Sequence, residues 1–266
     1  MSHSSQLSAG APVDERRLTP YALTCVALLT VLGFSLGCSE FVVIGIEPEL
    51  SEAFGVSLSR VGELISFFSV AYAVLTPVLA ITTGRFKRFT LLVAYSVIFI
   101  AANVAMAFAP TFDILLASRV LLGAVSGALL AVGVTYIPEL VGVKRTSLMI
   151  SIVYAAFSVA MVVATSAGKL IAEALDWHVA MIGVLAMAVV TCVVLIAVLP
   201  RTGSTDEVST MREQAALFLE PQILTGMCIF IFGVGSVYVF YGYITPYLET
   251  VLGMDALARA RCSWRM

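Results

Sequence analysis

The sequence predicts an all-α membrane protein, and three observations lead to this class. Seven apolar runs account for most of the 266 residues, and each has about the 20 residues that a helix needs to cross a hydrocarbon core of about 30 Å. The chain is 60% hydrophobic and 12% charged, whereas a soluble domain is about 25% charged. The runs also lack the alternation of a membrane β-strand. Because lipid offers no hydrogen-bond partners, runs of this kind must be helical.

The predicted helices follow one another with short connections, apart from one long polar link. Residues 1–20 are Ser, Ala, Gly, Pro and charged residues with little to bury, so we expect a disordered cytoplasmic tail. A six-helix transmembrane bundle is predicted for 21–199, a cytoplasmic linker for 200–221, a seventh transmembrane helix for 222–254 and an aberrant tail for 255–266. The seven helices are expected at 21–46, 61–83, 89–108, 112–140, 147–172, 177–199 and 223–251.

The positions of lysine and arginine predict the orientation. With a cytoplasmic N-terminus, nine of the 15 basic residues lie on the cytoplasmic side, and among those that precede the seventh run only Arg60 and Lys169 face outwards. Basic residues favour the cytoplasmic side of a membrane. We therefore expect a multi-pass protein of the plasma (inner) membrane with its N-terminus in the cytoplasm.

Reporter fusions test this topology. Cytoplasm-active reporters fused near Lys87 and Ser204 should be active, and those near Ser51 and Ala174 should be silent. The reverse pattern of activity would contradict the orientation.

Three arginines after the seventh run do not fit the charge bias. Arg259, Arg261 and Arg265 would lie outside, in a tail that is unlike the sequence before it. One interpretation is an exposed tail without a role. The other is that the chain is a truncated product of a longer parent and lacks a C-terminal half.

Two ionisable residues lie within predicted helices. Glu40 is in the first helix and Arg119 is in the fourth, where each would cost about 2.5–3.5 kcal/mol at a helix centre on the insertion scale. Either side chain can reach for the headgroups, or it can serve a function. The functional interpretations are a protonatable carrier for Glu40 and a buried cation that holds helices together for Arg119.

Small and aromatic residues mark further candidate positions. Gly123 and Gly127 form a pair four residues apart that lets another helix approach closely. Tyr72, Tyr238 and Tyr241 are candidate substrate-lining residues, although membrane-interface or packing roles are an open alternative for the aromatic residues of the seventh helix.

Composition excludes several classes of function. A net charge of −2 offers no basic stripe for nucleic acid. The five cysteines are scattered without metal-ligand spacing. We expect no enzyme activity, no catalytic residues, no cofactor and no metal.

Four motifs, in order along the chain, carry a resemblance to a known family. They are Ser39-Glu40-Phe41-Val42-Val43 with Gly45 and Pro48, Thr83-Gly84-Arg85-Phe86-Lys87-Arg88, Arg119-x-x-x-Gly123-x-x-x-Gly127, and Phe240-x-x-Tyr243-Ile244-x-Pro246-Tyr247. Together they resemble the major facilitator superfamily, in its drug:proton antiporter and sugar-efflux branch. The chain departs from this pattern at Gly84, where many relatives have Asp, and at Asp176-Trp177-His178. The glycine-rich motif expected in the fifth helix retains only Gly168.

The resemblance implies a fold and a function. The fold is the N-terminal six-helix bundle of a major facilitator fold plus a seventh transmembrane helix. The function is export of a small molecule (a drug, sugar or nucleoside) by proton-coupled alternating access. Glu40 and Arg119 would couple protons, and Gly84, Arg85, Lys87 and Arg88 would form the gating loop. Gly123, Gly127 and Gly168 would pack helices.

The partners implied are a small-molecule substrate, protons, the lipid bilayer and the missing half. Two alternatives remain open. The chain is an inert truncated fragment without transport activity, or it is a seven-helix receptor, which would instead place its N-terminus outside.

Overall fold

The structure is a computed structural model that describes residues 19–84, 86–201 and 220–250. It divides into two compact units, Met1–Asp206 and Glu207–Met266. The predicted tails at 1–20 and 255–266 and the linker at 200–221 lie almost entirely outside the described residues, as does Arg85.

The described residues are helical, as predicted. The helices of the first unit are α1 (Pro20–Gly45), α2 (Glu47–Phe54), α3 (Leu58–Thr83), α4 (Arg88–Ala107), α5 (Phe112–Val134), α6 (Ile137–Val141), α7 (Val143–Ala174) and α8 (Trp177–Val198). The second unit contains α10 (Pro221–Thr250). In the described part of the chain, six helices are long and apolar enough to cross a membrane, all within the first unit. That α10 also crosses the membrane stays a prediction.

Side-chain caps begin several of these helices. The hydroxyl groups of Thr19, Ser57 and Thr111 accept hydrogen bonds from the backbone amides three residues later. Each such bond satisfies an amide that the first helical turn leaves unpaired. The helix starts are therefore set locally, by residues next to the apolar runs.

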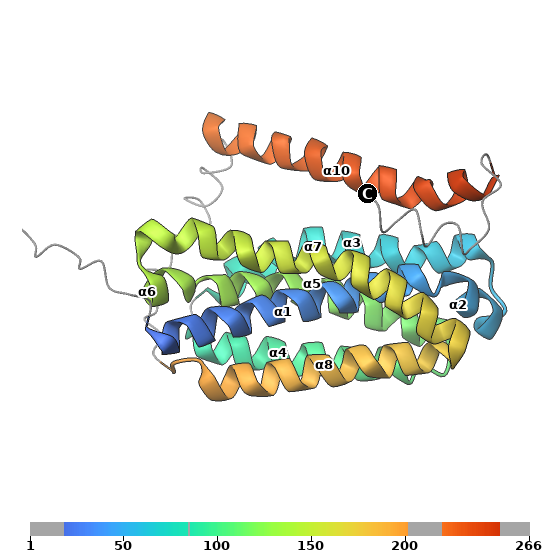
Figure 1. Cartoon of the computed structure of the whole chain (residues 1–266), viewed down its shortest axis with the longest axis horizontal. Coiled ribbons are helices and arrows are strands. Elements are labelled where there is room, and N and C mark those ends of the chain that lie inside the picture. Colours follow the sequence, from blue (N-terminus) through green and yellow to red (C-terminus); the bar gives the residue numbers. More distant parts are fainter. Residues whose placement is uncertain (1–18, 85, 202–219, 251–266) are drawn as a thin grey trace, which may run out of the picture. The chain divides into compact units, whose positions relative to one another are not determined.

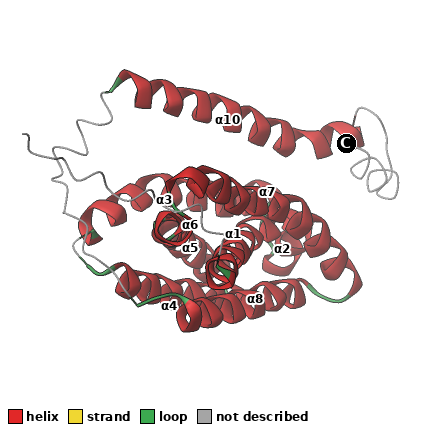
Figure 2. Ribbon diagram, turned by 60° about the vertical axis from the view of Figure 1, so that its left-hand side comes forward, coloured by secondary structure: helices red, strands yellow, loops and turns green. Residues whose placement is uncertain are grey.

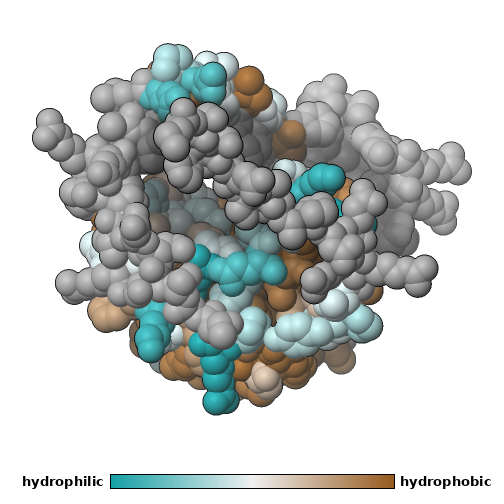
Figure 3. Space-filling model, turned by 90° about the vertical axis from the view of Figure 1, so that its left-hand side faces the viewer, coloured by the Kyte–Doolittle hydropathy of each residue, from teal (hydrophilic) through white to brown (hydrophobic). Residues whose placement is uncertain are grey.

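Helices α1 and α5 form the centre of the bundle. Figures 1 and 2 show α4 and α8 along one side of them and α3 and α7 along the other. In the most apolar stretches of α1 and α5, 61% and 67% of the residues are buried, against 17% in α3 and 22% in α7. Figure 3 views the bundle from the end that carries α6: hydrophilic side chains lie on this end, and hydrophobic ones cover the lower flank. This distribution is expected for helices that cross a bilayer.

Glycines allow two helix pairs in the bundle to pack backbone to backbone. A Cβ atom built at Gly33 of α1 would lie 2.8 Å from the carbonyl oxygen of Val153 on α7. At Gly123 of α5 it would meet the carbonyl oxygen of Phe68 on α3, and at Gly127 it would meet the Thr76 hydroxyl group. A Cβ atom built at Gly168 of α7 would lie 3.2 Å from Cγ2 of Val42 on α1. These are the close approaches that small residues permit between membrane helices.

Replacement of Gly123 by alanine should destabilise the bundle. The added methyl group would collide with the Phe68 carbonyl oxygen and lie 3.2 Å from the Ala71 Cβ atom, so α3 and α5 must separate. Overpacking of this kind costs about 1–3 kcal/mol. The measurement is unfolding of the purified chain in a titration with sodium dodecyl sulfate.

Gly183→Ala is the matched control, because nothing lies within 4 Å of a Cβ atom built there in α8. Helix propensity alone should make this control neutral or up to about 1 kcal/mol more stable. Equal stability losses in the two variants would contradict the packing role of Gly123.

The helices differ from the predicted runs at several points. The predicted helix at 112–140 is two helices, α5 and α6, with a break at Thr135 and Tyr136. The short helix α2 was not predicted. Helix α7 begins at Val143 rather than 147, because its first turn is polar and hydropathy alone does not detect it.

Candidate functional site

Arg119 is a fully buried cation in the centre of the bundle. It lies on α5 about two turns after the cap residue Thr111, and its exposed fraction is 0%. This confirms the prediction of a buried cation. The alternative, a guanidinium group that reaches for the headgroups, does not fit this burial.

Backbone carbonyl groups from two other helices surround the guanidinium group. Nη1 donates to the carbonyl oxygen of Ser39 at 2.8 Å, and Nη2 donates to that of Glu40 at 3.0 Å, both on α1. Nε donates to the carbonyl oxygen of Leu64 on α3 at a longer 3.4 Å. Hydrogen bonds to charged groups contribute about 1.5–3 kcal/mol each. Arg119 therefore ties three helices together at one level of the bundle.

An aromatic ring completes the surroundings of Arg119. The Cζ atom lies 4.4 Å from the centre of the Phe68 ring, a cation–π geometry that gains strength away from water. Gly123, one turn further along α5, is what allows the Phe68 backbone to come this close. The small residues of α5 thus position the ring beside its arginine.

Glu40 adds the negative charge of this site. Its side chain is partly buried on α1, and it interacts electrostatically with the Arg119 guanidinium group and with Tyr72 of α3. Tyr154 of α7 lies near Tyr72. A carboxylate, a guanidinium group and two phenols from four helices therefore lie near one another.

A further buried contact connects α4 to the same level of α1. The Ser39 hydroxyl group donates to Oδ1 of Asn103 at 2.8 Å, and Nδ2 of Asn103 donates to the Phe99 carbonyl oxygen at 2.8 Å. Ser39 and Asn103 each have an exposed fraction of 0%. Since the Ser39 carbonyl oxygen binds Arg119, polar contacts run from α4 through α1 to α5.

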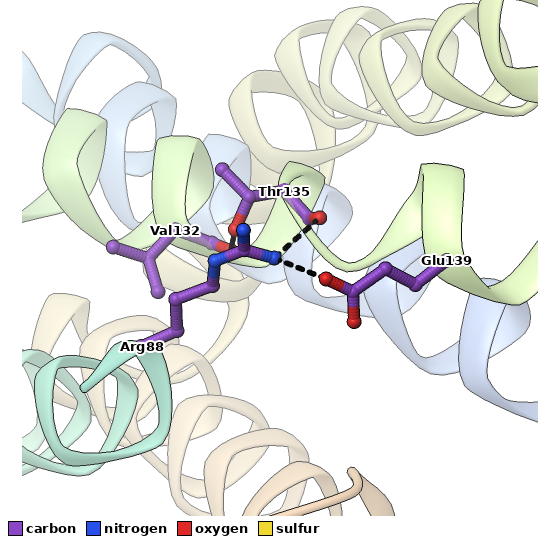
Figure 4. Close-up of polar contacts among 4 residues, drawn as sticks. All are labelled: Arg88, Val132, Thr135 and Glu139. Atoms are coloured by element: carbon purple, nitrogen blue, oxygen red, sulfur yellow. Dashed lines mark hydrogen bonds and ion pairs between the residues drawn. The ribbon is translucent and has the colours of Figure 1, made fainter. Parts of the chain in front are cut away.

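The predicted gating loop lies at the other end of α3, and it includes a second arginine that forms an ion pair. Arg88, the first residue of α4, forms an ion pair of 2.6 Å with Glu139 of α6, and its Nη1 also donates to the Thr135 carbonyl oxygen at 3.4 Å. The Thr135 hydroxyl group donates to the Val132 carbonyl oxygen at 2.7 Å (Figure 4). A cation beside the last carbonyl groups of α5 complements the helix dipole. Through this ion pair and hydrogen bond, Arg88 links the start of α4 to the break between α5 and α6.

Two acidic side chains next to the membrane-spanning helices have shifted pKa values. Burial raises the pKa of Glu47 in α2. At the start of α8, Oδ1 of Asp176 accepts from the His178 backbone amide at 2.7 Å, and this hydrogen bond is the main cause that lowers the pKa of Asp176. Burial therefore favours the protonated form of Glu47, which lies seven residues after Glu40.

The structure separates the predicted site residues into distinct groups. Glu40, Arg119 and Tyr72 come together, and Gly123, Gly127 and Gly168 lie at close helix contacts. Gly84 ends α3 and Lys87 precedes α4, beside Arg88. The side chains of Tyr238 and Tyr241 lie outside the described part of the chain. The functional roles of all these residues stay predictions.

Sequence reasoning missed Asn103 and Tyr154. Asn103 carries a detectable signal, since an amide in the apolar run Ile100-Ala-Ala-Asn103-Val-Ala needs a buried partner. Tyr154 has no such signal in its run. Among the described residues, no three His, Cys, Asp or Glu side chains gather to hold a metal ion.

Comparisons with known proteins agree with this architecture. The model of the Major Facilitator Superfamily matches residues 29–260. The chain is 26% identical over 230 residues to the uncharacterized MFS-type transporter YbcL of Bacillus subtilis, covering 86% of this chain and 59% of the relative. It is 27% identical over 228 residues to the MFS-type transporter YtbD of the same organism, covering 86% and 58%.

A third relative comes from another organism. The inner membrane transport protein YdhP of Escherichia coli is 25% identical over 223 residues, covering 84% of this chain and 57% of the relative. The chain thus spans less than three fifths of the length of these relatives. The family match covers most of the chain. The described part of the chain also has six helices long and apolar enough to cross a membrane. The chain belongs to the Major Facilitator Superfamily.

Proposed function

We propose that the chain is part of a proton-linked permease of the inner membrane, in the drug:proton antiporter and sugar-efflux branch, that exports a small molecule. The observation that carries this proposal is the buried pairing of Arg119 with the Ser39–Glu40 segment of α1. Ionisable residues inside a membrane mark ion and substrate pathways. Here the carboxylate that interacts with Arg119 belongs to the residue whose carbonyl group Arg119 binds.

The mechanism that this site supports is alternating access. Proton binding to Glu40 neutralises the charge that faces Arg119, so the guanidinium group loses an electrostatic partner while its carbonyl bonds remain. The relative stability of the two states between which the six-helix bundles rock then depends on protonation, as a coupled transport cycle requires. The ion pair between Arg88 and Glu139, at the opposite end of the bundle, would break and re-form as the bundle moves.

The partly exposed side of this site is where a substrate would bind. Tyr72 and Tyr154 supply phenol groups from α3 and α7, and these two helices are the least buried of the six candidate spans. A phenol offers a ring face and a hydrogen-bonding hydroxyl group, which suits drugs, sugars and nucleosides alike. A susceptibility assay is therefore needed to identify the class of substrate.

The test is a susceptibility screen in a host that lacks its major efflux pumps. The chain is co-expressed with the C-terminal part of YdhP, the stretch beyond its match to this chain, and growth is measured against panels of cationic drugs, sugar analogues and nucleoside analogues. We expect protection against at least one class, lost when a protonophore collapses the proton gradient. Protection that survives the protonophore would contradict proton coupling, and no protection in any class would contradict export.

A further inference from the structure

Asn103 is a buried amide whose orientation is set by its two partners. A carbonyl oxygen only accepts hydrogen bonds, so the amino group of Asn103 must face the Phe99 carbonyl oxygen, at 2.8 Å. Oδ1 therefore faces the Ser39 hydroxyl group, also at 2.8 Å. Because an amide oxygen also only accepts, the Ser39 hydroxyl group must be the donor.

Ser39 differs from other serines of the bundle in the partner of its hydroxyl group. The hydroxyl groups of Ser69, Ser126 and Ser158 each donate to the carbonyl oxygen four residues earlier on their own helix. That is the usual partner for a serine within a membrane helix. The Ser39 hydroxyl group on α1 instead donates to Oδ1 of Asn103 on α4, which offers it an acceptor on another helix.

The same serine is bound on its other side by Arg119. The Ser39 carbonyl oxygen accepts from Nη1 of Arg119 at 2.8 Å, and that of Glu40 accepts from Nη2 at 3.0 Å. The stretch of α1 that carries Glu40 is thus held between an amide on α4 and a guanidinium group on α5. Asn103 reaches Arg119 through this stretch.

We propose that Asn103 is a positioning residue of the site. Through its hydrogen bond to Ser39, Asn103 fixes the position of α1 in which the Ser39 and Glu40 carbonyl groups bind Arg119. It thereby sets the separation between the Glu40 carboxylate and the Arg119 guanidinium group. This role rests on the proposed function only for the assignment of Glu40 as the proton site.

The size of the expected effect follows from Coulomb's law. A change of about 1 Å in the separation of two charges a few Å apart alters their interaction enough to shift a titration midpoint by about half a pH unit in a protein interior. When Asn103 is lost, the Ser39 hydroxyl group can turn to its own helix as the other serines do. The chain should therefore still fold, with α1 held differently.

The experiment follows the Glu40 carboxyl group in the purified 266-residue chain in lipid nanodiscs. Infrared absorption of the protonated carboxyl group is recorded against pH, with Glu40→Gln to assign the band. Asn103→Leu and Ser39→Ala should each shift the midpoint by about half a unit or more, and the double variant should shift it no further. Ser96→Ala is the matched control, since Ser96 is on α4 and equally buried, and it should leave the midpoint unchanged.

Two results would overturn the positioning role. One is an Asn103→Leu variant that unfolds more easily but keeps the wild-type midpoint, which would show a purely structural residue. The other is a pair of shifts that add in the double variant, which would show that Asn103 and Ser39 act separately.

A further readout separates this inference from the proposed function. If Glu40 does not titrate in the wild-type chain, proton coupling at Glu40 fails. The positioning role is then decided by a double-mutant cycle between Asn103→Leu and Arg119→Met, read as unfolding in sodium dodecyl sulfate. A coupling of about tenfold in the unfolding equilibrium supports the role, and additive effects overturn it.

Discussion

Replacement of Arg119 by methionine should abolish transport and leave membrane insertion intact. The carbonyl groups of Ser39, Glu40 and Leu64 lie within helices and keep their backbone partners when the guanidinium group is removed. What is lost is the two short charge-assisted bonds from α5 to α1. If these bonds exist in one of the two transport states, their loss shifts the equilibrium between the states by about 3 kcal/mol or more, about 100-fold in population.

The measurement is substrate efflux from membrane vesicles, with the chain paired with the C-terminal part of YdhP. Arg60→Met is the matched control, because Arg60 is an exposed arginine whose ion pair with exposed Asp113 is 3.8 Å long. Exposed pairs contribute about 0–1 kcal/mol, so this control should transport normally. Efflux by Arg119→Met within a few-fold of the wild-type rate would contradict the central role of Arg119.

Glu40→Gln should uncouple transport from the proton gradient. Glutamine keeps the shape of the side chain but cannot exchange a proton, and it removes the charge that interacts with Arg119 and Tyr72. We expect substrate to equilibrate across the membrane without being concentrated, so that accumulation falls to that of a passive carrier. Exchange of labelled for unlabelled substrate should persist.

Glu47→Gln is the control for this prediction. Burial raises the pKa of Glu47, so this carboxyl group near the same end of α1 is a rival proton site. The control should still concentrate substrate. If Glu47→Gln loses accumulation and Glu40→Gln retains it, the proton site has been assigned to the wrong residue.

Hydropathy predicted the helical class and the approximate spans because each run must satisfy its backbone internally in lipid. It missed α2, whose eight residues are too few to cross a membrane. Local signals for that helix were present: Pro48 and two glutamates in the first turn, then Gly55 with φ of +61° at the end. Similarly, Pro138 marks the start of α6, although the apolar pattern continues across the break at Thr135.

The site could be predicted only in part. A buried arginine at position 119 follows from its apolar neighbours, because hydrocarbon offers a cation no partner. Its partners do not follow, since they are backbone carbonyl groups 55 to 80 residues away, and every residue has such a group. The link from Ser39 to Asn103 spans 64 residues and depends on how α1 and α4 pack, which neither helix specifies alone.

Substrate-induced proton release tests the central claim most directly, namely that Glu40 beside Arg119 exchanges protons for substrate. The purified chain, assembled with the C-terminal part of YdhP, is placed in weakly buffered detergent solution with a pH-sensitive dye. A substrate identified by the susceptibility screen is then added. We predict release of protons on substrate binding, absent in Glu40→Gln and retained in Glu47→Gln. Proton release of normal size from Glu40→Gln would contradict the account.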